Sequence, residues 1–170
     1  MSEGEILQVK KSRQLDIDEE TYFEIIRKKT ASLIATSMAI GTASVIEDED
    51  LYLKMYKIGQ DAGIAFQIKD DIFDYQRRGI IGKPTGNDIK EKKITLPLLY
   101  VIKNSDSAER RRILRLIKKK NKNPAVVQEI IRMVKEKGGL DYAAKKMNEF
   151  RDNAIKGLME YPESEARESL

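Results

Sequence analysis

The sequence predicts an all-α protein built around several long helices. Apolar residues recur at helical spacing over most of the chain, and no stretch keeps the strict alternation of a β-strand. The predicted helices are interrupted by a stretch rich in Gly and Pro at 76–92 and by a Gly pair at 138–139. A chain of 170 residues fits one domain and is long enough to bury a sizeable core.

The pattern places helices at 19–45, 49–75, 93–103, 106–120, 124–137 and 140–160. Residues 3–9 form a short amphipathic piece, and 10–18 and 76–92 are expected to be loops. The acidic run at 47–50 is well placed for the positive end of the helix that follows. Residues 163–170 add a final turn.

Two residue types are absent, which excludes several classes of chemistry. Without Cys there are no disulfides, thiolate metal sites or cysteine nucleophiles, and without His there is no imidazole ligand or Ser-His-Asp triad. A metal would have to be held by oxygen, which favours Mg²⁺ or Ca²⁺. No apolar run approaches a membrane span and the N-terminus lacks a signal-peptide core, so we expect a soluble, cytoplasmic protein.

The sharpest feature is a cluster of carboxylates inside an apolar helical pattern. Asp70, Asp71 and Asp74 follow Gln67, and a helix places these four oxygen-bearing side chains on one face over two turns. Carboxylates crowded in this way repel one another, and a divalent cation reverses that penalty. We therefore expect the three aspartates to bind Mg²⁺ together with substrate phosphate oxygens. The alternative is a solvated acidic face.

Gly59 and Gly63 lie on the same face, one turn apart. Glycine inside a helix costs about 0.5–1 kcal/mol relative to alanine, so something bulky is expected to pass close to the backbone there. A bulky ligand and a packed neighbouring helix are the two alternatives.

Basic residues flank this face in the sequence. Lys29 and Thr30 lie in the first long helix, Lys83 lies in the 76–92 loop, and Lys93 follows that loop. A diphosphate needs cations from several directions, and the loop could fold Lys83 and Lys93 back towards the carboxylates.

A second basic run places eight Lys and Arg residues in thirteen positions, at 110–122. A solvated face of an amphipathic helix explains it, and contact with a membrane surface is an alternative. Nucleic-acid binding is not expected, because interleaved aromatic residues and a helix-turn-helix pattern are missing.

Four stretches together resemble the C-terminal half of trans-polyprenyl diphosphate synthases: GEILQ (4–8), KKTASL (28–33), GQDAGIAFQIKDDIFD (59–74) and GKPTGNDIKEKKITLPLLY (82–100). The resemblance implies the all-helical isoprenoid synthase fold, with residues 1–170 as the C-terminal part of one domain. It implies a transferase that condenses isopentenyl diphosphate head-to-tail with an allylic diphosphate, using Mg²⁺, with a prenyl chain passing Gly63. Helices that would pack on a missing N-terminal half expose an apolar face, so we also expect a homodimer or helix-swapped oligomer. Membrane contact is expected to be peripheral at most.

The resemblance also assigns roles to individual residues. Asp70, Asp71 and Asp74 match the second aspartate-rich motif, which binds Mg²⁺ with the allylic diphosphate. The residues that match diphosphate and substrate contacts are Lys29, Thr30, Phe66, Gln67, Lys83 and Lys93, and the lysines and Thr30 are the expected catalytic groups. Phe66 and Phe73 could face a carbocation, although core packing is the expected role.

The family's first aspartate-rich motif, which is followed by paired arginines, has no counterpart in these 170 residues. Arg77-Arg78 follows the second motif and is not that arginine pair. We therefore expect a fragment that is inactive alone. The alternatives are a non-catalytic helical partner subunit of a heteromeric synthase, a terpene cyclase-like relative and a basic nucleic-acid-binding module.

Overall fold

A computed structural model describes residues 2–15, 17–76 and 85–169. Within these ranges the chain is helical and contains no strand, as predicted. The elements are α1 (Ser2–Gln14), α2 (Glu19–Ile26), η1 (Arg27–Ala31), α3 (Ser32–Ala43), α4 (Glu49–Phe73), α5 (Asn87–Lys90), α6 (Leu96–Asn104), α7 (Ser107–Lys120), α8 (Pro124–Glu136), α9 (Gly139–Leu158) and α10 (Glu165–Ser169).

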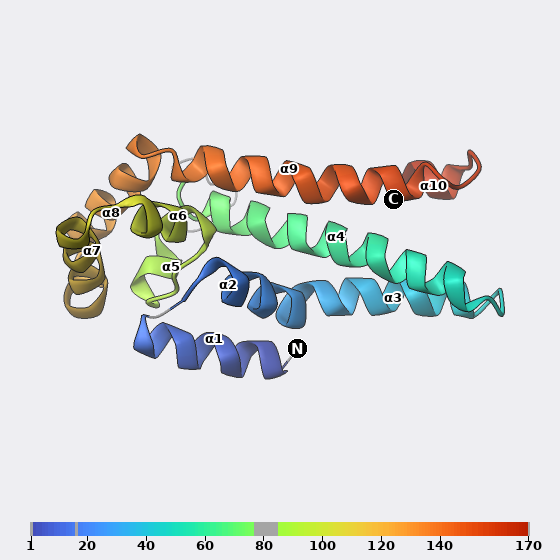
Figure 1. Cartoon of the computed structure of the whole chain (residues 1–170), viewed down its shortest axis with the longest axis horizontal. Coiled ribbons are helices and arrows are strands. Elements are labelled where there is room, and N and C mark those ends of the chain that lie inside the picture. Colours follow the sequence, from blue (N-terminus) through green and yellow to red (C-terminus); the bar gives the residue numbers. More distant parts are fainter. Residues whose placement is uncertain (1, 16, 77–84, 170) are drawn as a thin grey trace.

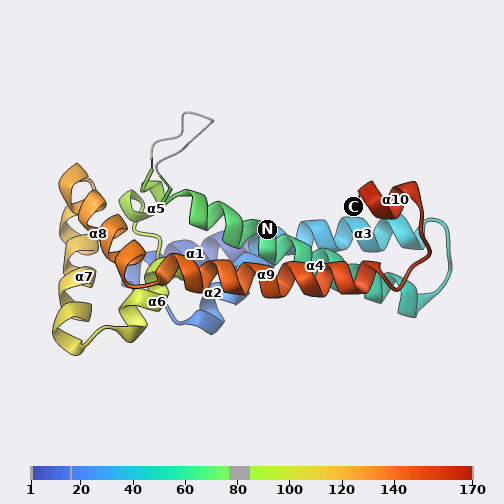
Figure 2. The same ribbon diagram turned by 90° about the horizontal axis from the view of Figure 1, so that it is seen from above.

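The long helices lie side by side along the long axis of the molecule (Figure 1). Helix α4 packs against α3 on one side and α9 on the other, and α1 lies against α2 and η1. Helices α7 and α8 stand at one end and cross the direction of the bundle (Figure 2). The carboxylate-bearing end of α4 points toward this end of the molecule.

Local signals explain where several helices begin. Asp18 accepts a hydrogen bond from the Thr21 amide at 2.8 Å, and Asp48, in the acidic run, accepts one from the Leu51 amide at 3.2 Å. Such N-caps satisfy amides that have no partner inside the helix. The acidic run thus begins α4 as predicted.

Four predicted boundaries were wrong. Residues 10–14 continue α1 rather than forming a loop, because Lys and Gln are good helix formers and the helix packs on η1. Helix α6 starts at Leu96 rather than 93, with Pro97 in its first turn, a common place for proline. The expected loop 76–92 contains α5, and the expected helix 19–45 contains the π-helical segment η1.

The two glycines of α4 serve helix packing. A Cβ atom at Gly63 would lie 2.6 Å from the Ala31 Cα, and one at Gly59 would lie 2.8 Å from the Ala35 Cα. The bulky object expected beside these glycines is therefore the backbone of η1 and α3. The interpretation that a prenyl chain passes there was wrong.

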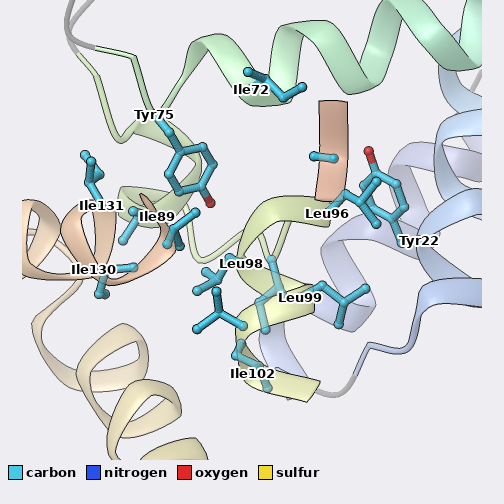
Figure 3. Close-up of a cluster of buried hydrophobic side chains, with 14 of the residues drawn as sticks. Tyr22, Ile72, Tyr75, Ile89, Leu96, Leu98, Leu99, Ile102, Ile130 and Ile131 are labelled. Atoms are coloured by element: carbon cyan, nitrogen blue, oxygen red, sulfur yellow. The ribbon is translucent and has the colours of Figure 1, made fainter. Parts of the chain in front are cut away.

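The buried core lies where α4, α5, α6 and α8 meet (Figure 3). Tyr75, just past the end of α4, is fully buried, and its hydroxyl shares a 3.1 Å hydrogen bond with the Thr95 hydroxyl. Ile72, Leu96 and Ile130 are also buried in this region. The core therefore fixes the end of α4 and the segment before α6 against each other.

Candidate functional site

A small polar pocket lies between α1, α2, η1, the end of α4, α5 and the segment before α6. Its volume is about 90 Å³. The charged side chains around it suit a polar head group better than a hydrocarbon chain. The charged side chains of its lining are Lys11, Lys29, Asp70, Asp71, Asp88 and Lys93.

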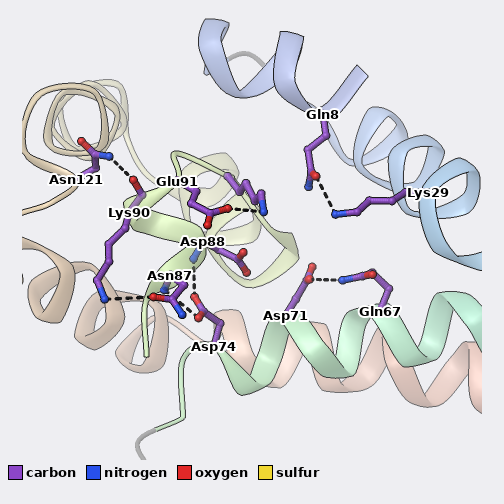
Figure 4. A network of polar contacts seen from close by, with 11 residues as sticks. Gln8, Lys29, Gln67, Asp71, Asp74, Asn87, Asp88, Lys90, Glu91 and Asn121 are labelled. Carbon is purple, nitrogen blue, oxygen red and sulfur yellow. Dashed lines mark hydrogen bonds and ion pairs between the residues drawn. The ribbon is translucent and has the colours of Figure 1, made fainter. Parts of the chain in front are cut away.

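The π-helical segment η1 carries Lys29 to this pocket and Thr30 to the Gln67 side chain of its lining. A π segment changes the direction in which successive side chains leave a helix, and such segments are frequent at functional sites. Helix α1 lies closely against it, because a Cβ atom at Gly4 would lie only 2.7 Å from the Lys29 backbone nitrogen. Gln8, one turn further along α1, accepts a 3.1 Å hydrogen bond from the Lys29 ammonium (Figure 4). The GEILQ stretch thus places α1 against η1 and contacts a pocket lysine.

A chain of hydrogen bonds fixes the side chains at the floor of the pocket. The Thr30 hydroxyl donates to Gln67 Oε1 at 2.7 Å, and Gln67 Nε2 donates to Asp71 Oδ1 at 3.1 Å. The Tyr22 hydroxyl donates to the other carboxylate oxygen of Asp71 at 2.7 Å. The structure therefore joins Thr30, Gln67 and Asp71, and adds Tyr22, which the sequence did not indicate.

Burial makes the Asp71 carboxyl hard to ionise. Its removal from water raises its pKa to about 7, although the hydrogen bonds from Tyr22 and Gln67 act in the opposite direction. Burial likewise raises the pKa of Asp88 to about 6, with the Asp74 charge adding to the shift and Lys93 opposing it. The pocket thus concentrates carboxyl groups whose negative charge a cation would stabilise.

The three aspartates of the motif do not share one environment. Asp70 and Asp71 line the pocket, and Asp70 is exposed. Asp74 instead accepts hydrogen bonds from the backbone amides at the start of α5, from Asn87 at 2.9 Å on Oδ1 and from Asp88 at 3.0 Å on Oδ2. Asp74 is not part of the pocket lining, and each of its oxygens accepts an amide hydrogen bond from the start of α5 (Figure 4).

The remaining predicted residues fall into three groups. Lys93 lines the pocket and forms a 2.6 Å ion pair with Glu91. Phe66 and Phe73 are 62% and 55% exposed, so the expected core packing is wrong for both, and Phe66 is not part of the pocket. Lys83 lies outside the described residues.

The donor set fits a divalent cation that is shared with a phosphate ligand. No group of three or more acidic side chains in the described ranges could hold a metal by itself. Mg²⁺, however, is commonly bound by one or two carboxylates together with water and substrate phosphates. Asp70 and Asp71 supply two carboxylates, and Lys29 and Lys93 supply positive charge for a phosphate at the same pocket.

None of the helices in the described residues combines the length and the apolar character that a membrane crossing requires.

Comparisons with known proteins identify the family of this chain. The polyprenyl synthetase family profile matches residues 1–134. An all-trans-nonaprenyl-diphosphate synthase (geranyl-diphosphate specific) of Rhodobacter capsulatus is 33% identical and aligns with 100% of this chain and 52% of its own length. The heptaprenyl diphosphate synthase component 2 of Bacillus subtilis is 31% identical over 98% of this chain and 47% of its own length.

A solved structure shares both the fold and the sequence. The polyprenyl synthase of Caulobacter crescentus, in complex with calcium and isoprenyl diphosphate, superposes with a TM-score of 0.89 at 32% identity. The match covers 99% of this chain and 52% of that one. The chain thus spans about half the length of the relatives it matches. It belongs to the polyprenyl synthetase family and has the all-α isoprenoid synthase fold.

Proposed function

We propose that this chain binds the diphosphate group of an allylic prenyl diphosphate together with Mg²⁺, as part of a trans-prenyltransferase that adds isopentenyl diphosphate head-to-tail. The observation that supports this proposal most is the pocket itself. It sets two adjacent carboxylates, Asp70 and Asp71, beside two ammonium groups, Lys29 and Lys93. Carboxylates alone would suit a cation and lysines alone an anion, whereas a metal–diphosphate pair uses both.

Each side chain has a role in this proposal. Asp70 and Asp71 hold the metal, which when bound neutralises charge on the departing diphosphate. Lys29 and Lys93 contact phosphate oxygens and stabilise the charge that develops as the C–O bond breaks. Lys83 stays a further candidate for this role on the sequence alone. Thr30 and Gln67 orient Asp71, and Tyr22 holds its second oxygen.

No side chain of this chain is required as a general base. Prenyl transfer ends with loss of a proton, and the released diphosphate is itself a base. The absence of His therefore does not conflict with the reaction.

We further propose that the 170 residues by themselves bind the diphosphate but do not condense it. They contain a single DDxxD motif, and a trivalent leaving group is best stabilised from more than one side. Incorporation of labelled isopentenyl diphosphate into longer products by these 170 residues alone would contradict this part of the proposal.

A second candidate is a helical subunit of a heteromeric synthase. The Bacillus subtilis relative is named a component, which implies a further component in that protein. In this chain, large apolar side chains are exposed on α3 and α4, including Leu33, Ile40 and Leu53 at 54%, 62% and 55%. Such surface suits another helical element, either a second copy or a different subunit. Light scattering coupled to gel filtration distinguishes a dimer from a monomer that needs another partner.

Titration calorimetry with a non-hydrolysable allylic diphosphate analogue tests the main proposal. We expect binding that requires Mg²⁺ and that weakens at least about tenfold in Asp70→Asn, corresponding to about 1.4 kcal/mol. Asp50→Asn is the matched control, because Asp50 is an exposed aspartate in the first turn of the same helix, away from the pocket. Equal affinity with and without Mg²⁺, or equal losses in both variants, would refute the assignment.

A further inference from the structure

The solvent-facing side of helix α7 carries charges of one sign, all positive. All eight Lys and Arg residues between 110 and 122 are exposed. At 100° per residue, those of α7 at 111, 112, 115, 118 and 119 fall within an arc of about 120°. Among the described residues, only one of the eight takes part in an ion pair, that of Arg112 with Glu129 on α8.

A solvated face does not require this uniformity. The exposed positions of α9 alternate in sign, with Asp141, Lys145, Glu149, Arg151 and Asp152 along the helix. Mixed charges keep a surface soluble without producing a strong local field. The uniform sign on α7 is therefore a specific property of that helix.

The basic face is rigid and open. The opposite side of α7 buries Ile113 and Ile117 in the core, and the Asn121 amide donates a hydrogen bond to the Lys90 carbonyl of α5. Helix α7 stands at the end of the molecule, across the direction of the bundle (Figure 2). The charges are thus displayed on a fixed helix whose apolar side is already occupied by its own protein.

We propose that this face docks the protein on anionic phospholipid membranes through their phosphate head groups. Clusters of four to eight Lys and Arg residues on one helix are typical of binding to anionic lipid surfaces. Nucleic acid is the less suitable partner, because the face has no aromatic side chain on which a base could stack. Since the apolar side of α7 is buried, the attachment is electrostatic and reversible.

The face adjoins the candidate site. Lys118 lines an open groove with Lys92, Lys93, Gln8 and Ser12, and three of these residues, Lys93, Gln8 and Ser12, also line the pocket. This link to catalysis rests on the proposed function. A prenyl diphosphate is an amphiphile whose head group stays in water at a lipid surface while its tail enters the lipid. Docking through α7 would keep the pocket near the surface into which such molecules partition.

Vesicle co-sedimentation tests the proposal without any assay of catalysis. The purified protein is mixed with phosphatidylcholine vesicles that contain one-third phosphatidylglycerol, or none. We expect binding only to the anionic vesicles and its loss near 1 M salt, where the Debye length is about 3 Å. The triple variant Arg111→Glu, Arg115→Glu and Lys119→Glu should lower the partition coefficient by at least about 100-fold, at roughly fivefold per removed cation.

The control reverses the same number of charges elsewhere. Lys145→Glu, Arg151→Glu and Lys156→Glu change exposed positions of α9 and alter the net charge equally. Circular dichroism verifies that both variants are folded. Equal losses in the two variants would mean that net charge alone drives binding and would overturn the proposal. So would the absence of binding by the wild type, or preference for an oligonucleotide over the anionic vesicles. Failure of diphosphate binding at the pocket would leave this result unaffected, so the two proposals fail separately.

Discussion

Replacing Gly63 by alanine tests whether the close approach of α4 to η1 holds the site together. In an ordinary helix this substitution raises the free energy of unfolding by about 0.5–1 kcal/mol, because alanine loses less backbone entropy. At Gly63 the added Cβ would lie 2.6 Å from the Ala31 Cα and 3.0 Å from its Cβ, and ordinary contacts begin near 3.4 Å. The obstacle is backbone, so the two helices must separate by roughly 1 Å.

The expected cost follows from this separation. Overpacking a tight contact costs about 1–3 kcal/mol, which outweighs the gain in helix propensity. We expect the free energy of unfolding to fall by about 1–2 kcal/mol. For a protein of this size each kcal/mol shifts the melting temperature by about 2–4 °C, so Tm should drop by roughly 2–8 °C.

Gly41 supplies the matched control for this experiment. It lies in α3, and a Cβ added there meets nothing within 4 Å. Gly41→Ala should therefore raise Tm by about 1–4 °C. Both variants are compared with the wild type by urea denaturation and thermal melting. A Gly63→Ala protein that is as stable as Gly41→Ala would refute the helix-packing interpretation and revive that of an open channel.

Two further predictions concern the carboxylates in and beside the pocket. Asp74→Ala should destabilise the protein by about 1–2 kcal/mol and speed hydrogen exchange at the Asn87 and Asp88 amides, which lose their acceptors. Asp74→Asn should retain part of the protection, and unchanged exchange in Asp74→Ala would contradict the anchoring role. The pKa of Asp71 is raised to about 7 and that of Asp88 to about 6, so the folded protein holds protons that the unfolded chain releases above pH ~4. The free energy of unfolding without Mg²⁺ should therefore fall as pH rises from 4 to 7. The slope is at most about 1.4 kcal/mol per pH unit and per proton. Urea unfolding at pH 5 and pH 8 measures this slope, Asp71→Asn should reduce it, and a rise in stability over this range would show that the sign is wrong.

The helices could be predicted from the sequence, and a candidate site could be proposed from it, because their signals are local. Apolar periodicity marks the long helices, and the pair Asp70 and Asp71 stands out because carboxylates are costly in an apolar helical pattern. The neighbourhood of Lys29, Thr30, Gln67 and Lys93 was expected from the family resemblance, and the structure brings these four residues together.

What could not be predicted depends on contacts between distant segments. Tyr22 and Asp71 are 49 positions apart, and no local pattern indicates that a buried tyrosine will donate to that carboxylate. The π-helical geometry of η1 also has no marker in the sequence RKKTA. It matters because it determines which way Lys29 and Thr30 point.

Asp74 makes contacts that the motif alone does not indicate. Spacing on an ideal helix places it near Asp70, but α4 ends at Phe73 and the chain turns. The carboxylate then meets the free amides at the start of α5, which are strong partners for a negative charge. A helical wheel of α4 cannot show these amides, because α5 follows α4 in the sequence only after residues 77–84.

The position of the metal tests the central claim most directly. Crystals grown with Mn²⁺ in place of Mg²⁺ and a non-hydrolysable allylic diphosphate analogue would show the metal by its anomalous scattering. The account predicts a peak bonded to carboxylate oxygen of Asp70 or Asp71 and to diphosphate oxygen, with Lys29 and Lys93 on the diphosphate and Asp74 still bonded to the α5 amides. A peak on Asp74 with α5 displaced, or a diphosphate bound outside this pocket, would contradict it.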